Sequence, residues 1–319
     1  MAGEKVPLAP TRDGFGKALV ELGRADARIV VLSADLTDST RAAWFKKEFP
    51  ERFFSFGVAE QDMVSAAAGF SLMGKIPFVC TFGVFASGRA WDQIRVSIAY
   101  MQSNVKIVGT HGGVSVGGDG ATHQALEEIT LMRVLPNMTI VVPADAFEAK
   151  KATIAAAQKK GPVYLRLGRN AVPAVTEEKS VFTIGKADTL VEGSDVTIFS
   201  CGQLVYESIL ACEMLKAEKI SARVVNMHTP KPLDIEAVRA AARETQCIVT
   251  AEEHSVFGGM GSAVAEVIAE ECPVPLKRIG VRDQFGASGE PDELLAHFKL
   301  DAKSIAQAAR EAIRMKGKR

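Results

Sequence analysis

Short apolar runs alternate with longer helical patterns along the chain. In the first half these runs are apolar on both faces, which is typical of strands covered by helices on two sides. They lie at Arg28–Leu32, Arg52–Phe56, Ile76–Cys80, Val105–Val108, Thr139–Val142 and Val163–Leu167. The spacing between them predicts helices over Arg12–Leu22, Gln61–Leu72, Gly88–Ala99, Gln124–Val134 and Ala146–Lys159. This alternation predicts an α/β domain with a mainly parallel sheet.

The second half repeats the same alternation. Strands are predicted at Val196–Ser200, Ser221–Asn226, Cys247–Ala251 and Leu276–Val281, with helices between them and a closing amphipathic helix over Ala302–Met315. The stretch Asn170–Lys186 breaks the rhythm with a proline and the polar run Thr176–Ser180, so we interpret it as a linker. We therefore predict two doubly wound, mainly parallel-sheet domains in tandem, residues 1–180 and 187–319.

Composition narrows the class of protein. The 319 residues are enough for two cores, and the 38 basic and 38 acidic side chains cancel, so no net field points to nucleic acid or a membrane surface. The five cysteines are scattered without a CxxC pair, as expected of reduced thiols. The first residues lack the apolar stretch of a signal peptide. We expect a cytoplasmic protein.

Glu60 lies in the stretch Phe56-Gly-Val-Ala-Glu-Gln-Asp-Met63, which joins a predicted strand to a predicted helix. It falls at the carboxyl end of the strand, where open α/β sheets bind their ligands. A carboxylate in the first turn of a helix is also a favourable cap. Position alone therefore leaves a ligand-binding role and a capping role open.

Two phenylalanines follow the next predicted strand, in the turn Thr81-Phe-Gly-Val-Phe85. At this place Phe82 and Phe85 could stack on a flat heteroaromatic ring. Packing in the protein core is the alternative.

The stretch Gly109–Gln124 is a glycine-rich loop between a buried strand and a helix, with six glycines, two histidines and one aspartate. Glycines let a ligand approach the backbone closely. His111 and His123 can donate to an oxygen-rich substrate or exchange protons with it near neutral pH. No cluster of carboxylates or cysteines accompanies them, so no metal-ligating residue is predicted. So long a polar loop is an unusual connection, and we expect it to bind a ligand.

Arginines stand at other ends of predicted elements. Arg12 begins the first helix, and Arg166 and Arg169 follow the last strand of the first domain. A bidentate guanidinium is well suited to a phosphate at the end of a sugar. Each of them alone could equally be a surface or salt-bridge residue.

Taken in order, these motifs resemble the pyrimidine-binding and C-terminal domains of transketolase. The matching segments are Thr11-Arg12, Ser33–Thr40, Val58–Met63, Thr81–Phe85, Asp92–Arg95, His111–His123, Leu135-Pro136, Val142–Asp145 and Leu167–Arg169. The resemblance implies a thiamine-diphosphate-binding fold followed by a transketolase C-terminal domain. The reaction it implies is transfer of a two-carbon ketol unit from a ketose phosphate to an aldose phosphate, a step of the pentose phosphate pathway.

The resemblance assigns cofactor roles by position. Glu60 resembles the glutamate that binds the N1′ nitrogen of the aminopyrimidine and promotes loss of the thiazolium C2 proton. That role needs a carboxyl that shares a proton, so burial must oppose the effect of the helix terminus. Phe85, with Phe82 nearby, resembles the aromatic platform under the pyrimidine, and Asp35 matches an acidic position near the cofactor.

Substrate roles come from the same resemblance. His111, Asp119 and His123 resemble the groups that handle the sugar hydroxyls and carbonyl, and His111 also counts as a catalytic residue. Some family members carry glutamine at the position of His123, and there that residue is assigned to the cofactor. Three further residues resemble those that hold the terminal phosphate: Arg12, Ser39 and Arg169. Arg166 is the alternative to Arg169.

The family's diphosphate-binding motif is the part that does not match. It consists of Gly-Asp-Gly followed by an asparagine about 25 to 30 residues later, as the resemblance implies, to hold Mg²⁺ and the diphosphate. Gly118-Asp-Gly120 lies inside the substrate loop, and no asparagine stands at that distance, Asn137 being too close and Asn170 too far. We therefore expect an N-terminal-half partner chain to hold Mg²⁺, in a heterotetramer with a large apolar interface.

Other protein classes fit these motifs less well. The pyruvate dehydrogenase β chain and deoxyxylulose-phosphate synthase share the Ala-Glu-Gln motif at Glu60, but Thr110-His111 and Ser33–Thr37 fit transketolase better. A non-catalytic α/β binding or regulatory protein would be expected to have lost some of the polar site residues. A nicotinamide-dependent dehydrogenase is disfavoured because the glycine spacing of Phe257–Gly261 is wrong. In the second domain no catalytic residue is predicted, and its histidines are interpreted as structural: His228, His254 and His297.

Overall fold

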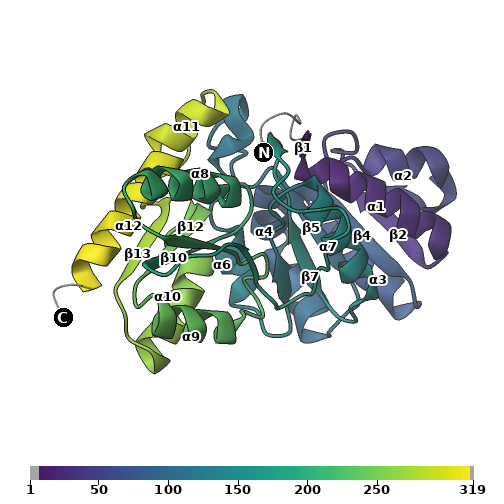
Figure 1. Cartoon of the computed structure of the whole chain (residues 1–319). Coiled ribbons are helices and arrows are strands. Elements are labelled where there is room, and N and C mark those ends of the chain that lie inside the picture. Colours follow the sequence, from purple (N-terminus) through teal and green to yellow (C-terminus); the bar gives the residue numbers. More distant parts are fainter. Residues whose placement is uncertain (1–6, 317–319) are drawn as a thin grey trace.

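The protein is described here by a computed structural model that covers residues 7–316. Figure 1 shows two α/β halves side by side, one coloured purple to teal and the other green to yellow. Each half holds one twisted sheet with helices on both faces. Within the described residues no helix is both long and apolar enough to cross a lipid bilayer.

The first sheet has six strands in the order β3-β2-β4-β5-β7-β6, and every neighbouring pair is parallel. All strands except β3 are buried along their whole length, which explains their uninterrupted apolar sequence. The strands are β2 Ile29–Ser33, β3 Phe53–Ser55, β4 Ile76–Phe82, β5 Lys106–Thr110, β6 Thr139–Val141 and β7 Val163–Arg166.

Helices cover both faces of this sheet. One face packs against α1 Thr11–Ala25, α2 Ala42–Glu48 and α7 Ala146–Gln158. The other face packs against α3 Glu60–Leu72, α4 Gly83–Arg89, a π-helical segment over Ile94–Tyr100 and α6 Glu128–Arg133. The short α5 Trp91–Gln93 joins α4 to the π-helical segment, and a 3-10 turn over Pro50–Arg52 precedes β3.

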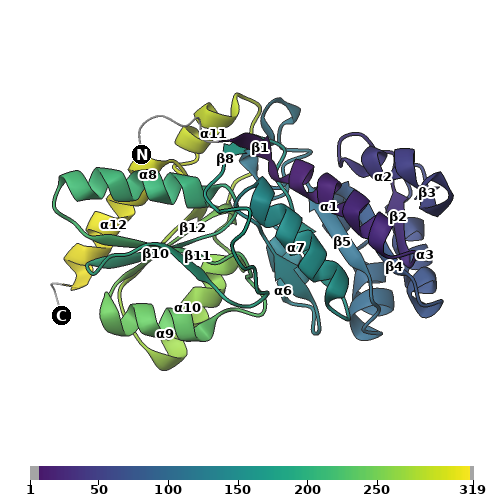
Figure 2. The same cartoon turned by 45° about the vertical axis from the view of Figure 1, so that its right-hand side comes forward.

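The second sheet has five strands in the order β13-β12-β10-β11-β9, of which only β9 is antiparallel to its neighbour. The strands are β9 Asp188–Val191, β10 Val196–Ser200, β11 Ala222–Asn226, β12 Ile248–Ser255 and β13 Leu276–Val281. Figure 2 shows α8 Leu204–Ala217 on one side of this sheet and α9 Ile235–Glu244 with α10 Met260–Glu271 on the other. Two further helices, α11 Pro291–His297 and α12 Ala302–Lys316, complete the C-terminal half.

One apolar cluster runs through both halves. It joins Met63 and Ile129 of the first half to Phe199, Met227 and Met260 of the second without a polar break. The ends of the first half are tied together by a separate two-stranded sheet, in which β1 Leu8–Pro10 pairs antiparallel with β8 Ala171–Pro173.

The predicted fold class, two mainly parallel α/β sheets in tandem, is confirmed by this architecture. The predicted linker was partly wrong, because it contains β8. The elements that were not predicted include α2, which begins after a left-handed residue without a side-chain cap, and the partly exposed edge strand β9. The short strand β1 and helix α11 were not predicted either. The helix predicted over Gln124–Val134 is shorter, since the glycine-rich loop continues to Glu127.

Candidate functional site

Four of the predicted site segments follow neighbouring strands of the first sheet. Glu60 comes after β3, Asp35 after β2, the Phe82–Phe85 turn at the end of β4, and the His111 loop after β5. Because these four strands are adjacent and parallel, their carboxyl ends open at one edge of the sheet. Asp35 is exposed there, on a residue with positive φ.

Glu60 is the first residue of α3, and only 3% of it is exposed. Arg89 Nη1 donates to Glu60 Oε1 at 3.0 Å. The guanidinium of Arg89 also lies 4.3 Å from the ring centroid of Phe85, one helical turn earlier. The sequence analysis missed Arg89, although its spacing of four residues from Phe85 on one helix was a usable signal.

Aromatic rings form the centre of the site. Phe82 and Phe85 are stacked with ring centroids 5.8 Å apart, and the His111 ring stacks on Phe82 at 3.7 Å. His123 meets both phenylalanines edge-on, at 6.0 Å from Phe82 and 5.5 Å from Phe85. The structure thus brings together the residues predicted for the cofactor and those predicted for the substrate.

His111 is buried, and its backbone has a φ of +59°. Its Nδ1 lies 2.9 Å from the hydroxyl of Thr110. Burial lowers the pKa of His111 to about 3, and the positive charges of Arg12 and Arg169 act in the same direction. At neutral pH His111 is therefore an uncharged imidazole, which can donate or accept a hydrogen bond but carries no positive charge.

The predicted anion-binding arginines lie around this histidine. Arg12 Nη1 donates to the carbonyl of Ser39 at 2.8 Å, which joins two of the predicted phosphate contacts. Arg169 Nη1 lies 3.5 Å from Asp119 Oδ1. Arg41, which the sequence analysis did not single out, also acts on the pKa of His111. Arg12, Arg41 and Arg169 therefore form a positively charged region around His111, which we call the basic corner. It lies beside the stacked phenylalanine rings.

Arg166 was the predicted alternative to Arg169 for binding the terminal phosphate, but its side chain is not free to take that role. Its side chain is 6% exposed and forms an ion pair with the fully buried Glu128. A second guanidinium nitrogen donates to the carbonyl of Glu253 at 2.6 Å. Arg166 therefore holds the two halves of the molecule together and is not available to a substrate.

The glycine-rich loop is held by the second half of the chain. Ser115 donates through its hydroxyl to Glu253 Oε2 at 3.1 Å and through its N–H to Oε1. Gln124 Nε2 donates to the carbonyl of Ala287 at 2.8 Å. Gly113 has φ +91° and ψ 177°, and a Cβ at this position would overlap with the carboxylate of Glu253.

The comparisons with known proteins agree over almost the whole chain. Residues 9–175 match the transketolase pyrimidine-binding domain, and residues 185–305 match the transketolase C-terminal domain. A putative transketolase C-terminal section from Methanocaldococcus jannaschii is 48% identical over 306 residues, covering 95% of this chain and 96% of that protein. The 6-deoxy-6-sulfo-D-fructose transketolase subunit SqwH from Clostridium sp. (strain MSTE9) is 45% identical over 305 residues, covering 96% and 95%.

A solved structure is similar to the same extent. It is described as a split gene transketolase, inactive beta4 tetramer, and it superposes on this chain with a TM-score of 0.89. The sequence identity is 50%, and the match covers 96% of this chain and 99% of that one.

Proposed function

This chain belongs to the transketolase family, and we propose that it is the subunit of a split transketolase that contributes the pyrimidine-binding and C-terminal domains. The observation that carries the proposal is one constellation at the edge of the first sheet. A buried carboxyl, Glu60, is linked through Arg89 to the ring of Phe85, which stacks on Phe82. His111 lies against the other ring, that of Phe82. We divide the chain into the two domains at residues 1–180 and 187–319.

The side chains at this edge fit the aminopyrimidine of thiamine diphosphate. Phe85 and Phe82 offer a flat apolar surface to the ring, and His123 meets Phe85 edge-on. We assign Asp35, in the loop after β2, to the same cofactor. The carboxyl of Glu60 is buried, and we assign it the role of sharing a proton with the N1′ nitrogen. When bound, the cofactor stabilises the carbanion of the transferred two-carbon unit. We assign its diphosphate and Mg²⁺ mainly to the partner chain.

Arg89 takes part in this arrangement through Glu60. Its guanidinium is half exposed and lies 3.0 Å from the Glu60 carboxylate. An ion pair favours the charged form of a carboxyl. Arg89 occupies only Oε1 of Glu60, so the second carboxylate oxygen remains open to a ring nitrogen that shares a proton with it.

We assign the substrate to the basic corner. His111, as a neutral imidazole, can hold the carbonyl or a hydroxyl of the sugar by hydrogen bonding, and Asp119 and His123 can bind further hydroxyls. Arg12 and Arg169, with Ser39, can hold the terminal phosphate of a ketose or aldose phosphate. Transfer of a two-carbon ketol unit between such sugars is the reaction we propose.

The donor sugars to be tested should include ones whose terminal anion is not a phosphate. The relative SqwH is named for 6-deoxy-6-sulfo-D-fructose, whose sulfonate is a terminal anion like a phosphate. A guanidinium binds either anion through the same planar pair of N–H donors. The basic corner therefore supports a terminal anion as the common feature of the substrates.

A partner chain is supported by exposed apolar side chains around α3, the helix that begins at Glu60. Large apolar side chains are exposed on both ends of α3 and on the π-helical segment that packs against it. Exposed apolar groups that lie together mark protein interaction sites. The similar solved structure, an inactive beta4 tetramer of a split gene transketolase, supports the same need. We propose an N-terminal-half partner and an assembly with two copies of each chain. The exposed residues are Val58, Leu72, Met73, Val96, Tyr100 and Met101.

The test is calorimetric titration of thiamine diphosphate with Mg²⁺ into the chain alone and into its mixture with an N-terminal-half subunit. We expect weak binding alone, tight binding in the mixture, and ketol transfer from xylulose 5-phosphate to ribose 5-phosphate only in the mixture. Tight Mg²⁺-dependent binding by the chain alone would contradict the proposed division of the site.

Replacement of Glu60 tests the chemistry. Glu60→Gln keeps the shape of the side chain but cannot cycle a proton with the pyrimidine, so we expect the assembly to form and turnover to be nearly abolished. Asp62→Asn, which alters an exposed carboxylate in the same helical turn, is the matched control and should retain turnover. Turnover of Glu60→Gln close to that of the wild type would remove Glu60 from the mechanism.

A further inference from the structure

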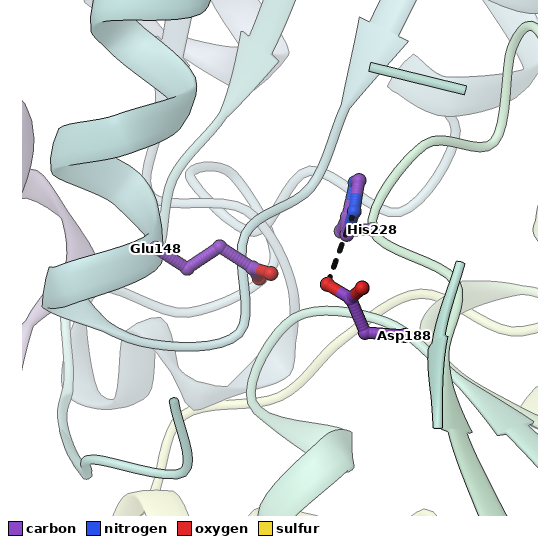
Figure 3. A group of neighbouring side chains, drawn as sticks. All are labelled: Glu148, Asp188 and His228. Carbon is purple, nitrogen blue, oxygen red and sulfur yellow. Dashed lines mark ion pairs between the residues drawn. The ribbon is translucent and has the colours of Figure 1, made fainter. Parts of the chain in front are cut away.

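Three side chains of the types that bind metal ions meet at the boundary between the two halves of the chain. Glu148 lies in the first turn of α7, Asp188 begins β9, and His228 follows β11. Figure 3 shows these side chains pointing toward one another from three separate elements. One ligand atom from each lies within 4.8 Å of the others, and His228 Nε2 is 3.7 Å from Asp188 Oδ2.

His228 is fixed in an orientation that leaves one nitrogen free. The side chain is fully buried, and its ring packs on Phe182 with centroids 4.3 Å apart. Its Nδ1 lies 2.8 Å from the hydroxyl of Thr229. Its Nε2, which faces the two carboxylates, is buried without a hydrogen-bond partner in the described part of the chain. Leaving such an atom unpaired is costly, and it is the atom a metal ion would bind.

Glu148 is held just as firmly. Its carboxylate accepts hydrogen bonds from Asn226 Nδ2 at 2.8 Å and from the N–H of Ala144 at 2.6 Å. Two accepted bonds leave lone pairs on both oxygens. Burial raises the pKa of Glu148 to about 7, and the nearby carboxylate of Asp188 adds to this effect. A cation at this place would remove that cost, because it favours the ionised carboxyl.

We propose that Glu148, Asp188 and His228 bind one divalent transition-metal ion of the zinc type, which joins the two halves of the chain. Imidazole with two carboxylates is a ligand set that zinc accepts, at about 2.0 to 2.2 Å. Ligand atoms around such an ion lie about 3.5 Å apart, so the longest separation must shorten by about 1 Å. Asp188 can supply this movement because its side chain is 46% exposed and opens the site to solvent. Water completes the coordination.

One positive charge opposes the ion. Burial raises the pKa of Asp188 and lowers the pKa of His228; the charge of Lys151 opposes the first shift and adds to the second. Its ammonium group is held away by the carbonyl of Glu177, to which it donates at 2.7 Å. The two carboxylates would therefore carry a charge of −2 toward the ion, and the one lysine would oppose it with a charge of +1. This site is separate from the magnesium assigned to the partner chain. If the zinc proposal fails, the proposed function is therefore unaffected.

The test uses the full chain without its partner, so that the cofactor's magnesium site does not interfere. Calorimetric titration with Zn²⁺ should show one ion bound per chain, and the midpoint of thermal unfolding should rise with Zn²⁺, since the ion binds only the folded state. Asp188→Asn changes the partly exposed ligand and does not endanger the core. We expect it to weaken Zn²⁺ binding at least tenfold and to abolish the rise.

A second variant and a control make the result specific. Glu148→Gln keeps the volume of the buried side chain and should show the same loss of binding. His297→Gln removes another histidine that lies outside the cluster, and it should bind Zn²⁺ like the wild type. The proposal is overturned if the wild type shows no Zn²⁺-dependent stabilisation, or if Asp188→Asn binds Zn²⁺ as tightly as the wild type.

Discussion

Gly113 is the position where a single methyl group should separate the loop from the domain that holds it. Its backbone, at φ +91° and ψ 177°, lies in a region that is essentially restricted to glycine. A Cβ would also point into the carboxylate of Glu253, which accepts both the N–H and the hydroxyl of Ser115. Gly113→Ala therefore strains the backbone and displaces Glu253 at once.

The magnitude follows from these two effects. Backbone strain in this region costs about 1 to 3 kcal/mol. Losing hydrogen bonds to the buried carboxyl costs about 2 kcal/mol more. The smaller conformational freedom of alanine in the unfolded chain returns about 0.5 to 1 kcal/mol. We expect Gly113→Ala to lower the free energy of unfolding by about 3 kcal/mol, a large part of the stability of an ordinary domain.

Urea unfolding followed by fluorescence and circular dichroism measures this change, with steady-state kinetics of the assembled enzyme beside it. His111 stands two residues from Gly113, so turnover should fall more than the population of folded protein does. Gly118→Ala is the matched control, because this glycine of the same loop has open space around it and no positive φ. A Gly113→Ala protein within 0.5 kcal/mol of the wild type, roughly the range of harmless surface changes, would refute the reasoning.

Two other predictions concern the basic corner. Because the folded pKa of His111 is about 3 and its ordinary value is 6.5, the unfolded chain binds more protons below pH 6.5, and stability is lost as the pH falls. The destabilisation caused by His111→Asn, measured by urea unfolding, should therefore shrink by about 2 kcal/mol between pH 7 and pH 5, and an unchanged difference would contradict the assigned pKa. Arg169→Lys keeps the charge but loses the planar pair of donors, so KM for a phosphorylated donor should rise about tenfold with little change in kcat. An equal loss with an unphosphorylated ketose would remove the phosphate from the role of Arg169, and Arg24→Lys, in an exposed ion pair, is the control.

The sheets could be predicted because buried parallel strands leave continuous apolar runs. Strands β10 and β13 begin and end at the predicted residues. Edge strand β9 has only four residues and is partly exposed, so it left no such run. The π-helical turn of Ile94–Tyr100 was predicted as ordinary helix, since its apolar spacing is close to that of an α-helix.

The site could be predicted only in part. Glu60, Phe82, Phe85 and His111 each follow a strand, and the carboxyl ends of neighbouring parallel strands meet at one edge. The contact between Ser115 and Glu253 joins residues 138 positions apart in the sequence, and no local pattern encodes it. The roles of the site residues remain predictions that the variants above test.

The hydrogen bonds from Ser115 to Glu253 tie the glycine-rich loop of the first domain to the second domain, which limits how the two domains can be recombined. A genetic crossover between β8 and β9 would join this loop to the second domain of a related protein. The carboxylate at the position of Glu253 would then be placed for the loop of that relative. The proposed sugar-binding loop would then lose its fit, although each domain kept its own core. We therefore expect recombination to pass this pair of domains on together.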